Sequence, residues 1–353
     1  MSMGLAGPAD DAALRGLLRA MPMGSAVRVG FEREASYFAA ARVQGEVQVG
    51  VARGPDGRVV GMGLRAVAPG FLGGRPADVG YLGDLRLLPE HRGGTLLARG
   101  YRFLRELHGD GRASVYATML VADNAQAAAV LRGGRAGLPV YRDLGLFLTP
   151  AVVLGLRPAA PSLPGVSIER GSVERLEDIV ASLNAFGRAR EFAPRHAPAD
   201  FLPGGRWLGM RPEDFLLAVR GGRIVGTLAR WDQRPFRQTR VHGYAPALDL
   251  ARRLVRSLPA PGGLVPHFYA AFPSAEEPAV LRLLVDALRR EAAGGPELYF
   301  ILGLHERDPL AAALAGIPRV PFSGRLFAVH WEDGAAEAER IAAGLPYLEA
   351  GAL

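Results

Sequence analysis

The sequence predicts an α/β protein, more closely an α+β one, with two similar domains that each hold a mixed, mostly antiparallel sheet flanked by helices. Three observations support this prediction. The chain has 353 residues, 49% of them apolar, which suffices for two hydrophobic cores. Similar blocks recur in the same order in both halves. The segment RPAAPSLPG at 157–165 has three prolines in nine residues, a composition typical of a stiff linker.

Each repeated block predicts the same succession of elements. A strand pair with a tight glycine turn comes first, followed by a strand, an amphipathic helix, and a strand that ends near another helix start. In the first half these segments lie at 51–63, 78–88, 95–108 and 114–131, and in the second half at 218–228, 265–272, 279–292 and 297–314. This order indicates a diverged duplication of one mixed α/β domain.

The repeat and the proline-rich segment together predict the domain boundaries. An N-terminal domain is expected at 1–156, the linker at 157–165, a second domain at 166–331 and a C-terminal tail at 332–353.

The composition excludes several classes of site. There is no cysteine, which removes disulfides, thiolate nucleophiles, cysteine-bound zinc and iron–sulfur clusters. The seven histidines lack metal-ligand spacing, so no metal site is expected. The net charge of +7 comes from 42 cations, all arginine, and suits an anionic partner. These arginines are interleaved with 35 acids instead of forming a stripe, so nucleic-acid binding is not expected.

No membrane segment is expected either. The longest apolar stretch, at 145–156, is too short to span a bilayer and contains Pro150. The first residues carry acids where a secretion signal needs positive charge. The sequence therefore predicts a soluble, cytoplasmic protein.

The segment DLRLLPEHRGGTLLA at 84–98 carries the most chemistry. An apolar strand runs to Leu88, Pro89 ends the strand ladder, and a short turn with two glycines leads into a helix. Glycines let a ligand approach the backbone, and the first turn of a helix offers unpaired N–H groups. With Arg92 beside them, these groups predict an anion site suited to a pyrophosphate.

This segment resembles the pyrophosphate loop of the GNAT acyltransferase superfamily, in which a strand, a proline and an Arg/Gln-x-x-Gly-x-Gly/Ala loop precede a helix. Arg92 matches the first motif position, whereas Thr95 and Leu97 stand where the family has glycine, or glycine or alanine. ADNAQAAAVL at 122–131 is similar to the family's Asn-x-x-Ala segment, with Leu131 in place of a frequent tyrosine.

The resemblance implies acyl transfer, expected to be acetyl, from acetyl-CoA to a small-molecule or peptide amine by direct attack. It implies that a backbone N–H near Leu85 and Leu87 binds the thioester oxygen. The residues expected to bind acetyl-CoA are Leu85, Leu87, Arg92, Gly93, Gly94, Thr95, Leu96, Leu97 and Asn124. The second half lacks such a site, because Glu276 and Glu277 would repel a phosphate and Pro278 has no N–H.

Asp84 is the first candidate for the general base that deprotonates the amine, or for the group that holds a water. Strand alternation predicts that Asp84 shares a face with Leu82 and Arg86, opposite Tyr81 and Leu85. Tyr81 becomes the candidate if its own face lines the cleft, and Glu32 is a third option.

Two segments are candidates for the acceptor site. Tyr37 follows the first predicted strand, and the segment at 230–244 gathers polar and aromatic side chains. From these segments we expect the acceptor to contact Tyr37, Trp231, Gln233, Arg237 and His242. The 230–244 segment could equally be a hydrogen-bonded scaffold. Two other functions stay open: a CoA-binding sensor or scaffold without turnover, and an aminoacyl-tRNA-dependent transferase.

Overall fold

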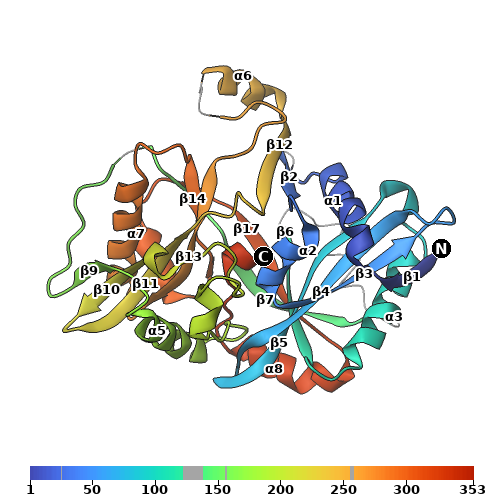
Figure 1. Ribbon diagram of the computed structural model, residues 1–353, viewed down its shortest axis with the longest axis horizontal. Coiled ribbons are helices and arrows are strands. Elements are labelled where there is room, and N and C mark those ends of the chain that lie inside the picture. Colours follow the sequence, from blue (N-terminus) through green and yellow to red (C-terminus); the bar gives the residue numbers. More distant parts are fainter. Residues whose placement is uncertain (25, 122–137, 156, 255–257) are drawn as a thin grey trace.

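The computed structural model describes residues 1–353 except 25, 122–137, 156 and 255–257. Two large sheets lie side by side, with the N-terminal part of the chain on one side and most of the second half on the other (Figure 1). The confirmed fold class is therefore mixed α/β, with two large sheets. Among the described residues, no helix combines the length and the apolar character that crossing a bilayer requires.

The first sheet has eight strands in the order β1-β3-β4-β5-β6-β17-β7-β15. Their bounds are β1 Ser2–Leu5, β3 Glu46–Arg53, β4 Val59–Leu72, β5 Arg75–Leu87, β6 Val115–Val121, β17 Ser323–His330, β7 Val140–Leu148 and β15 Leu304–His305. Alternation along β3 points Val49 and Val51 to one face, where they pack against α1 (Asp11–Ala20) and α2 (Tyr37–Ala41). Gly50 faces the other side, against Phe103 of α3 (Leu96–His108).

The second sheet has seven strands in the order β16-β8-β14-β13-β11-β10-β9. Their bounds are β16 Arg319–Val320, β8 Ala151–Val153, β14 Tyr299–Ile301, β13 His267–Ala275, β11 Arg223–Trp231, β10 Phe215–Arg220 and β9 Ser167–Arg170. Helix α7 (Pro278–Ala292) packs its leucines on one face, and α5 (Leu176–Arg188) covers the other. Proline at the start of α7 suits a first turn, whose N–H groups have no partner within the helix.

The pairing pattern supports the predicted duplication. In the first sheet β3, β4 and β5 pair antiparallel and β6 joins β5 parallel. In the second sheet β10, β11 and β13 pair antiparallel and β14 joins β13 parallel. Helices α3 and α7 occupy the same place in the two series, each after the third strand.

The two sheets do not follow the boundaries predicted from the sequence. Strand β8 lies before residue 157 but pairs with β14 of the second sheet. Strand β17 lies in the predicted second domain but pairs with both β6 and β7 of the first sheet. Each half of the chain thus contributes a strand to the sheet of the other half. The composition of the linker could not reveal this, because it carries no information about which strands pair.

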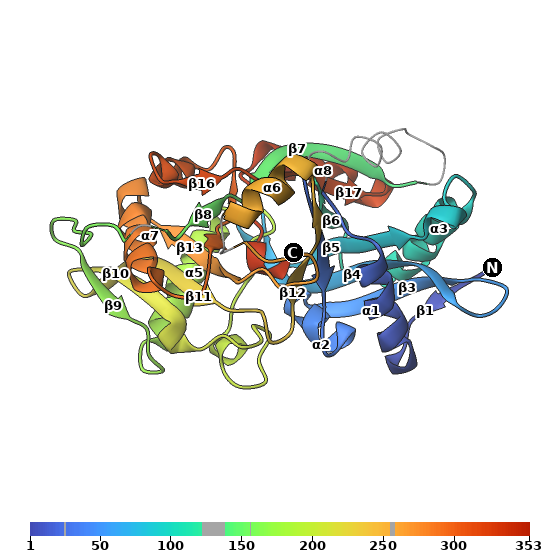
Figure 2. The same ribbon diagram turned by 90° about the horizontal axis from the view of Figure 1, so that it is seen from above.

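The final residues are also more than a peripheral tail. Helix α8 (Ala335–Ala343) packs on the first sheet, and the chain then reaches the centre of the molecule, where both views place the C-terminus (Figures 1 and 2). Tyr347, Leu348 and Glu349 are buried there.

A two-stranded ribbon adds another link between the halves. It pairs β2 (Val27–Glu32) of the first half with β12 (Gln238–Tyr244) of the second, and it leads to the projecting α6 (Pro246–Leu254; Figure 1). The 3-10 helices are η1 Pro8–Asp10, η2 Arg42–Gln44, η3 Pro89–His91, η4 Pro198–Phe201, η5 Pro212–Asp214, η6 Pro309–Leu314, η7 Glu332–Gly334 and η8 Ala350–Ala352.

Candidate functional site

The strands β5 and β6 begin side by side and then separate. Among their described residues, the parallel ladder joins two pairs, Gly80 with Tyr116 and Tyr81 with Ala117. Gly80 has no side chain, which is necessary because a Cβ there would collide with the Tyr116 ring. Beyond these pairs, β5 continues to Leu87. The Thr118 hydroxyl of β6 still donates to the Leu82 oxygen at 2.8 Å, but the described part of β6 forms no ladder with β5 after Tyr81.

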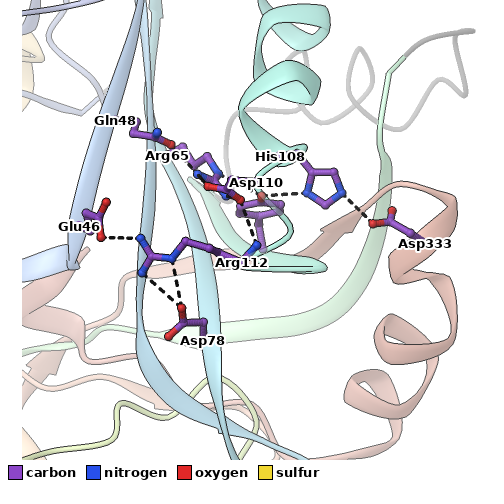
Figure 3. Close-up of polar contacts among 9 residues, drawn as sticks. Glu46, Gln48, Arg65, Asp78, His108, Asp110, Arg112 and Asp333 are labelled. Carbon is purple, nitrogen blue, oxygen red and sulfur yellow. Dashed lines mark hydrogen bonds and ion pairs between the residues drawn. The ribbon is translucent and has the colours of Figure 1, made fainter.

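A cluster of polar side chains anchors this junction (Figure 3). The Arg65 guanidinium of β4 forms two hydrogen bonds to the Asp110 carboxylate, at 2.7 and 2.8 Å, and donates to the Tyr116 hydroxyl at 3.0 Å. His108, at the end of α3, contacts the Tyr116 hydroxyl at 3.0 Å and the Asp333 carboxylate at 2.9 Å. The cluster fixes Tyr116, and with it the point where β5 and β6 separate.

A β-bulge interrupts β5 immediately after this junction. Met62 pairs with Arg86 and Leu64 with Gly83, so Asp84 and Leu85 together oppose Gly63. Asp84 has φ +49°, a backbone conformation that is uncommon for any residue except glycine. A bulge shifts the side-chain alternation by one residue. The expectation that Asp84 and Tyr81 lie on opposite faces is therefore wrong, and the charges of Arg33 and Arg237 influence the pKa of both side chains.

The Asp84 carboxylate has two close partners. The Tyr37 hydroxyl donates to it at 2.8 Å, and an Arg33 Nη lies 2.7 Å away, with the guanidinium stacked 4.7 Å above the Tyr37 ring. Burial by itself would raise the pKa of Asp84, but the charges of Arg33 and Arg86 and the Tyr37 hydrogen bond outweigh it and hold the pKa below its usual range. Asp84 is thus an ionised carboxylate at neutral pH.

Arg237 reaches the same cluster from the second half. Its Nη1 donates to the main-chain oxygens of Gly351 and Leu353, at 3.1 and 2.9 Å, and Gln233 donates to the Gly351 oxygen at 2.6 Å. Within the described part of the chain, its Nε and Nη2 are buried without a hydrogen-bond partner. Burial, together with the nearby Arg33 charge, lowers the pKa of Arg237 to about 10.

Two tyrosines complete the cluster. The Tyr81 ring lies over Gly83, where an added Cβ would be 2.8 Å from the ring edge. Burial, and then the charge of Asp84, raises the pKa of Tyr81 to about 12. Tyr269 holds the corresponding position in β13 and also lies near Arg237, and burial raises its pKa. Both hydroxyls are therefore protonated donors at neutral pH.

The structure thus brings together four of the residues predicted from the sequence, Tyr37, Tyr81, Asp84 and Arg237, and places Gln233 beside them. Sequence reasoning missed Arg33, Arg86 and Tyr269. The duplication contained a usable signal for Tyr269, because it aligns with Tyr81. Nothing in the sequence pattern singled out Arg33 among 42 arginines.

Three other predicted residues lie elsewhere. Glu32 is on the ribbon and pairs with Arg240 at 2.9 Å. His242 lies on the same ribbon against Gly30. Trp231 is fully buried in the core of the second sheet, and its Nε1 donates to the Leu208 oxygen at 2.9 Å. The expectation that Trp231 contacts an acceptor is wrong, because the alternation of β11 turns its ring into that core.

The predicted pyrophosphate loop lies just beyond the bulge. Eight residues, 88–95, connect β5 to α3, and Arg92, Gly93, Gly94 and Thr95 among them are exposed. Gly93 has φ +80°, and a Cβ there would meet nothing within 4 Å. No side chain caps the start of α3. Its first N–H groups therefore have no side-chain acceptor among the described residues, as an anion site requires.

The other residues predicted to bind acetyl-CoA differ in how exposed their side chains are. The Leu85 side chain is 47% exposed and Leu97 is partly buried, whereas Leu96 is 7% exposed in a small core with Ala52 and Val60. Leu96 can thus contribute only its backbone N–H. Leu87 packs beside that core, and its main-chain oxygen accepts from Arg92 Nε at 3.0 Å. Asn124 lies outside the described residues.

The corresponding region of the second sheet is closed. Two residues, Glu276 and Glu277, connect β13 to α7, and their carboxylates pair with Arg223 and Arg220. The bulge of β13 is also occupied, since the N–H of Phe272 donates to the Glu349 carboxylate at 2.8 Å. Of the two turns that follow these bulges, the one in the first sheet is the longer, and its residues Arg92 to Thr95 are exposed.

Comparisons with solved structures agree with this architecture, whereas comparisons of the sequence find no match. No family model and no curated protein sequence matches the chain. A solved GCN5-related N-acetyltransferase from Sphaerobacter thermophilus has a TM-score of 0.54 and 18% sequence identity, covering 93% of this chain and 94% of that one. A conserved protein of unknown function from Enterococcus faecalis V583, a probable N-acyltransferase, has a TM-score of 0.52 at 10% identity, covering 94% and 74% of the two chains.

A GCN5-related N-acetyltransferase from Kribbella flavida has a TM-score of 0.50 at 14% identity, covering 93% of this chain and 70% of its own. The chain therefore has the fold of the GCN5-related N-acetyltransferases over nearly its whole length.

Proposed function

We propose that this protein is an N-acyltransferase that moves an acetyl group from acetyl-CoA to an amine, using the first sheet. The single observation that supports this most is the succession along β5: a bulge at Asp84, an exposed edge at Leu85, and an open loop that leads to the uncapped start of α3. The proposed thioester site and the proposed pyrophosphate site are neighbours in that succession, within a fold shared with N-acetyltransferases.

The residues of the loop suit acetyl-CoA as donor substrate. Arg92 supplies an exposed positive charge, Gly93 and Gly94 leave the backbone accessible, and the N–H groups of Thr95 to Leu97 start the helix. Leu85 and Leu87 lie where the acyl end would rest. The departures at Thr95 and Leu97 leave these N–H groups in place, since backbone donors do not depend on the side chain.

In the proposed reaction, the ammonium group of the acceptor first loses one proton to solvent. The amine nitrogen then forms a bond to the acyl carbon, the carbon–sulfur bond breaks, and CoA leaves as a thiol with the second proton that the nitrogen gives up. The carboxylate of Asp84, with its low pKa, is a poor proton acceptor at neutral pH but a good partner for an ammonium group. We therefore assign Asp84 to holding the amine. Tyr81, with a pKa of about 12, is the hydroxyl assigned to donate to the departing sulfur.

The test measures thiol release from acetyl-CoA over a panel of amines and peptides, together with the melting temperature of the protein in acetyl-CoA. We expect amine-dependent release, and stabilisation of about 2.7 kcal/mol at a concentration about 100 times the dissociation constant. Stabilisation without release from any acceptor would favour a non-catalytic CoA-binding protein. A melting temperature that millimolar acetyl-CoA does not change would contradict the proposal altogether.

A further inference from the structure

We propose that the acceptor carries a carboxylate as well as its amine, and that the Nε and Nη2 edge of Arg237 binds that carboxylate while Asp84 holds the amine. This inference rests on the proposed function and assigns its substrate class. It follows from the hydrogen bonds that Arg237 makes and from those that it lacks.

Arg237 uses one end of its guanidinium and leaves one edge without a partner. Nη1 donates to the oxygens of Gly351 and Leu353, which fixes the orientation of the planar group. Nε and Nη2 are buried and have no partner among the described residues. These two nitrogens direct N–H bonds in parallel from the same edge, the arrangement that a carboxylate accepts through both of its oxygens. A buried donor without a partner is costly, so an occupant of this edge is favoured.

The neighbouring carboxylates are engaged by other partners. Glu34 pairs with Arg15 on α1 and Glu32 with Arg240 on the ribbon. Glu349 accepts hydrogen bonds from the N–H groups of Phe272 and Gly351 and from the Tyr347 hydroxyl. Among the described residues, therefore, no carboxylate pairs with the Nε and Nη2 edge of Arg237.

Arg33 adds to the preference for an anion. Its side chain is 7% exposed, one of its Nη atoms binds Asp84, and its Nη1 is also buried without a partner among the described residues. The positive charges of Arg33 and Arg237 repel each other. A carboxylate beside Arg237 offsets this repulsion, whereas a second ammonium group on the acceptor would increase it. The cluster thus discriminates against polyamines.

Asp84 and Arg237 together suit a zwitterion. Asp84 is ionised, and its side chain is 16% exposed, so a ligand can approach it. Arg237 is partly buried and reaches the same cluster from the opposite half of the chain. An ammonium group at Asp84 and a carboxylate at Arg237 pair each charge of a free amino acid with its opposite.

The experiment compares matched acceptors in the thiol-release assay: glycine with methylamine, L-phenylalanine with phenethylamine, L-lysine with cadaverine, and 4-aminobutyrate with butylamine. Phosphoethanolamine tests whether a phosphate replaces the carboxylate. We expect kcat/KM to be about ten- to a hundredfold higher for at least one carboxylate-bearing member than for its partner, the range of a charge-assisted hydrogen bond. Equal rates across every pair, or a preference for phosphoethanolamine, would overturn the inference and leave the acyltransferase proposal standing.

Arg237→Gln tests the residue itself. It should remove the preference for the carboxylate-bearing acceptor, so that the two members of each pair react at similar rates. Arg237→Lys keeps the charge but loses the two parallel N–H donors, so it should retain only part of the preference for the carboxylate-bearing acceptor. Arg234→Gln is the matched control, because Arg234 lies three residues away and its guanidinium already pairs with Asp232 and Glu297. It should keep the wild-type preference.

Urea unfolding of each variant establishes that it is folded. If Arg237→Gln does not fold, the Arg237→Lys comparison decides, and a full wild-type preference in Arg237→Lys would contradict the proposed edge. Equal losses with both members of a pair in Arg237→Gln would also contradict it, since they indicate a structural role. If no acceptor of any kind releases thiol although acetyl-CoA binds, the proposed function fails and this inference with it.

Discussion

Asp84 of β5 and Phe272 of β13 occupy the same position in two related sheets. Each lies in a bulge opposite one residue of its antiparallel neighbour, Gly63 or Leu228, and their φ angles are +49° and +53°. In both sheets the next strand joins in parallel three residues earlier, at Tyr81 and at Tyr269. The bulged backbone is therefore present in both sheets, but the groups around it differ. Asp84 lies near arginine side chains, whereas the N–H of Phe272 donates to the Glu349 carboxylate.

The first prediction concerns the two turns that follow these bulges. Arg92→Ala should weaken acetyl-CoA binding by about 1.5–3 kcal/mol, because it removes a charge-assisted hydrogen bond to a phosphate. Glu276→Ala is the matched control in the other half and should leave the affinity unchanged, since Glu276 pairs with Arg223 at a closed turn. Calorimetric titration measures both. A weaker affinity in Glu276→Ala would locate the donor site in the second half.

The second prediction concerns Asp84. Asp84→Asn should raise the KM for the acceptor amine about tenfold or more, because an ammonium group loses its ionic partner. It should also lower the free energy of unfolding by about 3 kcal/mol, since the buried Arg33 charge is left unpaired. Steady-state kinetics and urea unfolding measure these effects. A loss of kcat of about 10²–10⁴-fold with an unchanged KM would instead identify Asp84 as the general base.

The third prediction concerns Tyr81. Tyr81→Phe should lower kcat with little effect on acetyl-CoA affinity, because it removes the hydroxyl assigned to the departing sulfur while keeping the ring over Gly83. Tyr101→Phe is the control, as it also deletes a buried tyrosine hydroxyl, one that contacts Tyr141 away from the cluster. The deficit of Tyr81→Phe should shrink with acyl donors that have a better leaving group. A constant deficit across such donors would exclude the assigned role.

The fourth prediction is a pH dependence of stability. Burial, and to a lesser extent the charge of Arg206, lowers the pKa of His196 to about 3, and its Nδ1 accepts from Trp207 Nε1 at 3.1 Å. The unfolded chain takes up a proton on this residue near pH 6.5 and the folded chain does not. Stability is therefore complete above about pH 6.5 and falls by up to about 1.4 kcal/mol per pH unit below it.

His196→Gln isolates that dependence from other groups. Urea unfolding at pH 7.5, 6.0 and 5.0 should give a smaller decline for the variant than for the wild type. Parallel declines would mean that His196 protonates in the folded protein. The difference between the two proteins is the relevant quantity, because burial also lowers the pKa values of His267 and His305.

The fifth prediction concerns the junction of β5 and β6. Gly80→Ala should destabilise the protein by about 1–3 kcal/mol, because its Cβ would overlap the Tyr116 ring, which Arg65 and His108 hold in place. Gly16→Ala in α1 is the counterpart, with nothing within 4 Å of its added Cβ, and should stabilise by about 0.5–1 kcal/mol. Thermal unfolding compares them, and a neutral Gly80→Ala would mean that Tyr116 can move aside.

Much of the fold could be predicted from local patterns. The helices predicted at 95–108 and 279–292 agree with α3 and α7 to within one residue at each end, since amphipathic periodicity is a property of neighbouring residues. The exposed loop with Arg92, Gly93 and Gly94 was recognisable for the same reason. The bulge was not, because an extra residue in a strand has meaning only relative to its partner, and it moved Asp84 to the side of Tyr81.

By itself, the sequence determined the α/β class, the repeated order of elements and a glycine-containing loop before a helix, all of which depend on residues close together in the chain. The tertiary structure alone decided which distant segments meet. It inserted β17 between β6 and β7, turned Trp231 into a core, and brought Arg33, Asp84 and Arg237 into one cluster from segments about 50 and 150 residues apart. Such meetings depend on which strands pair and which charges are buried together, and no local pattern encodes either.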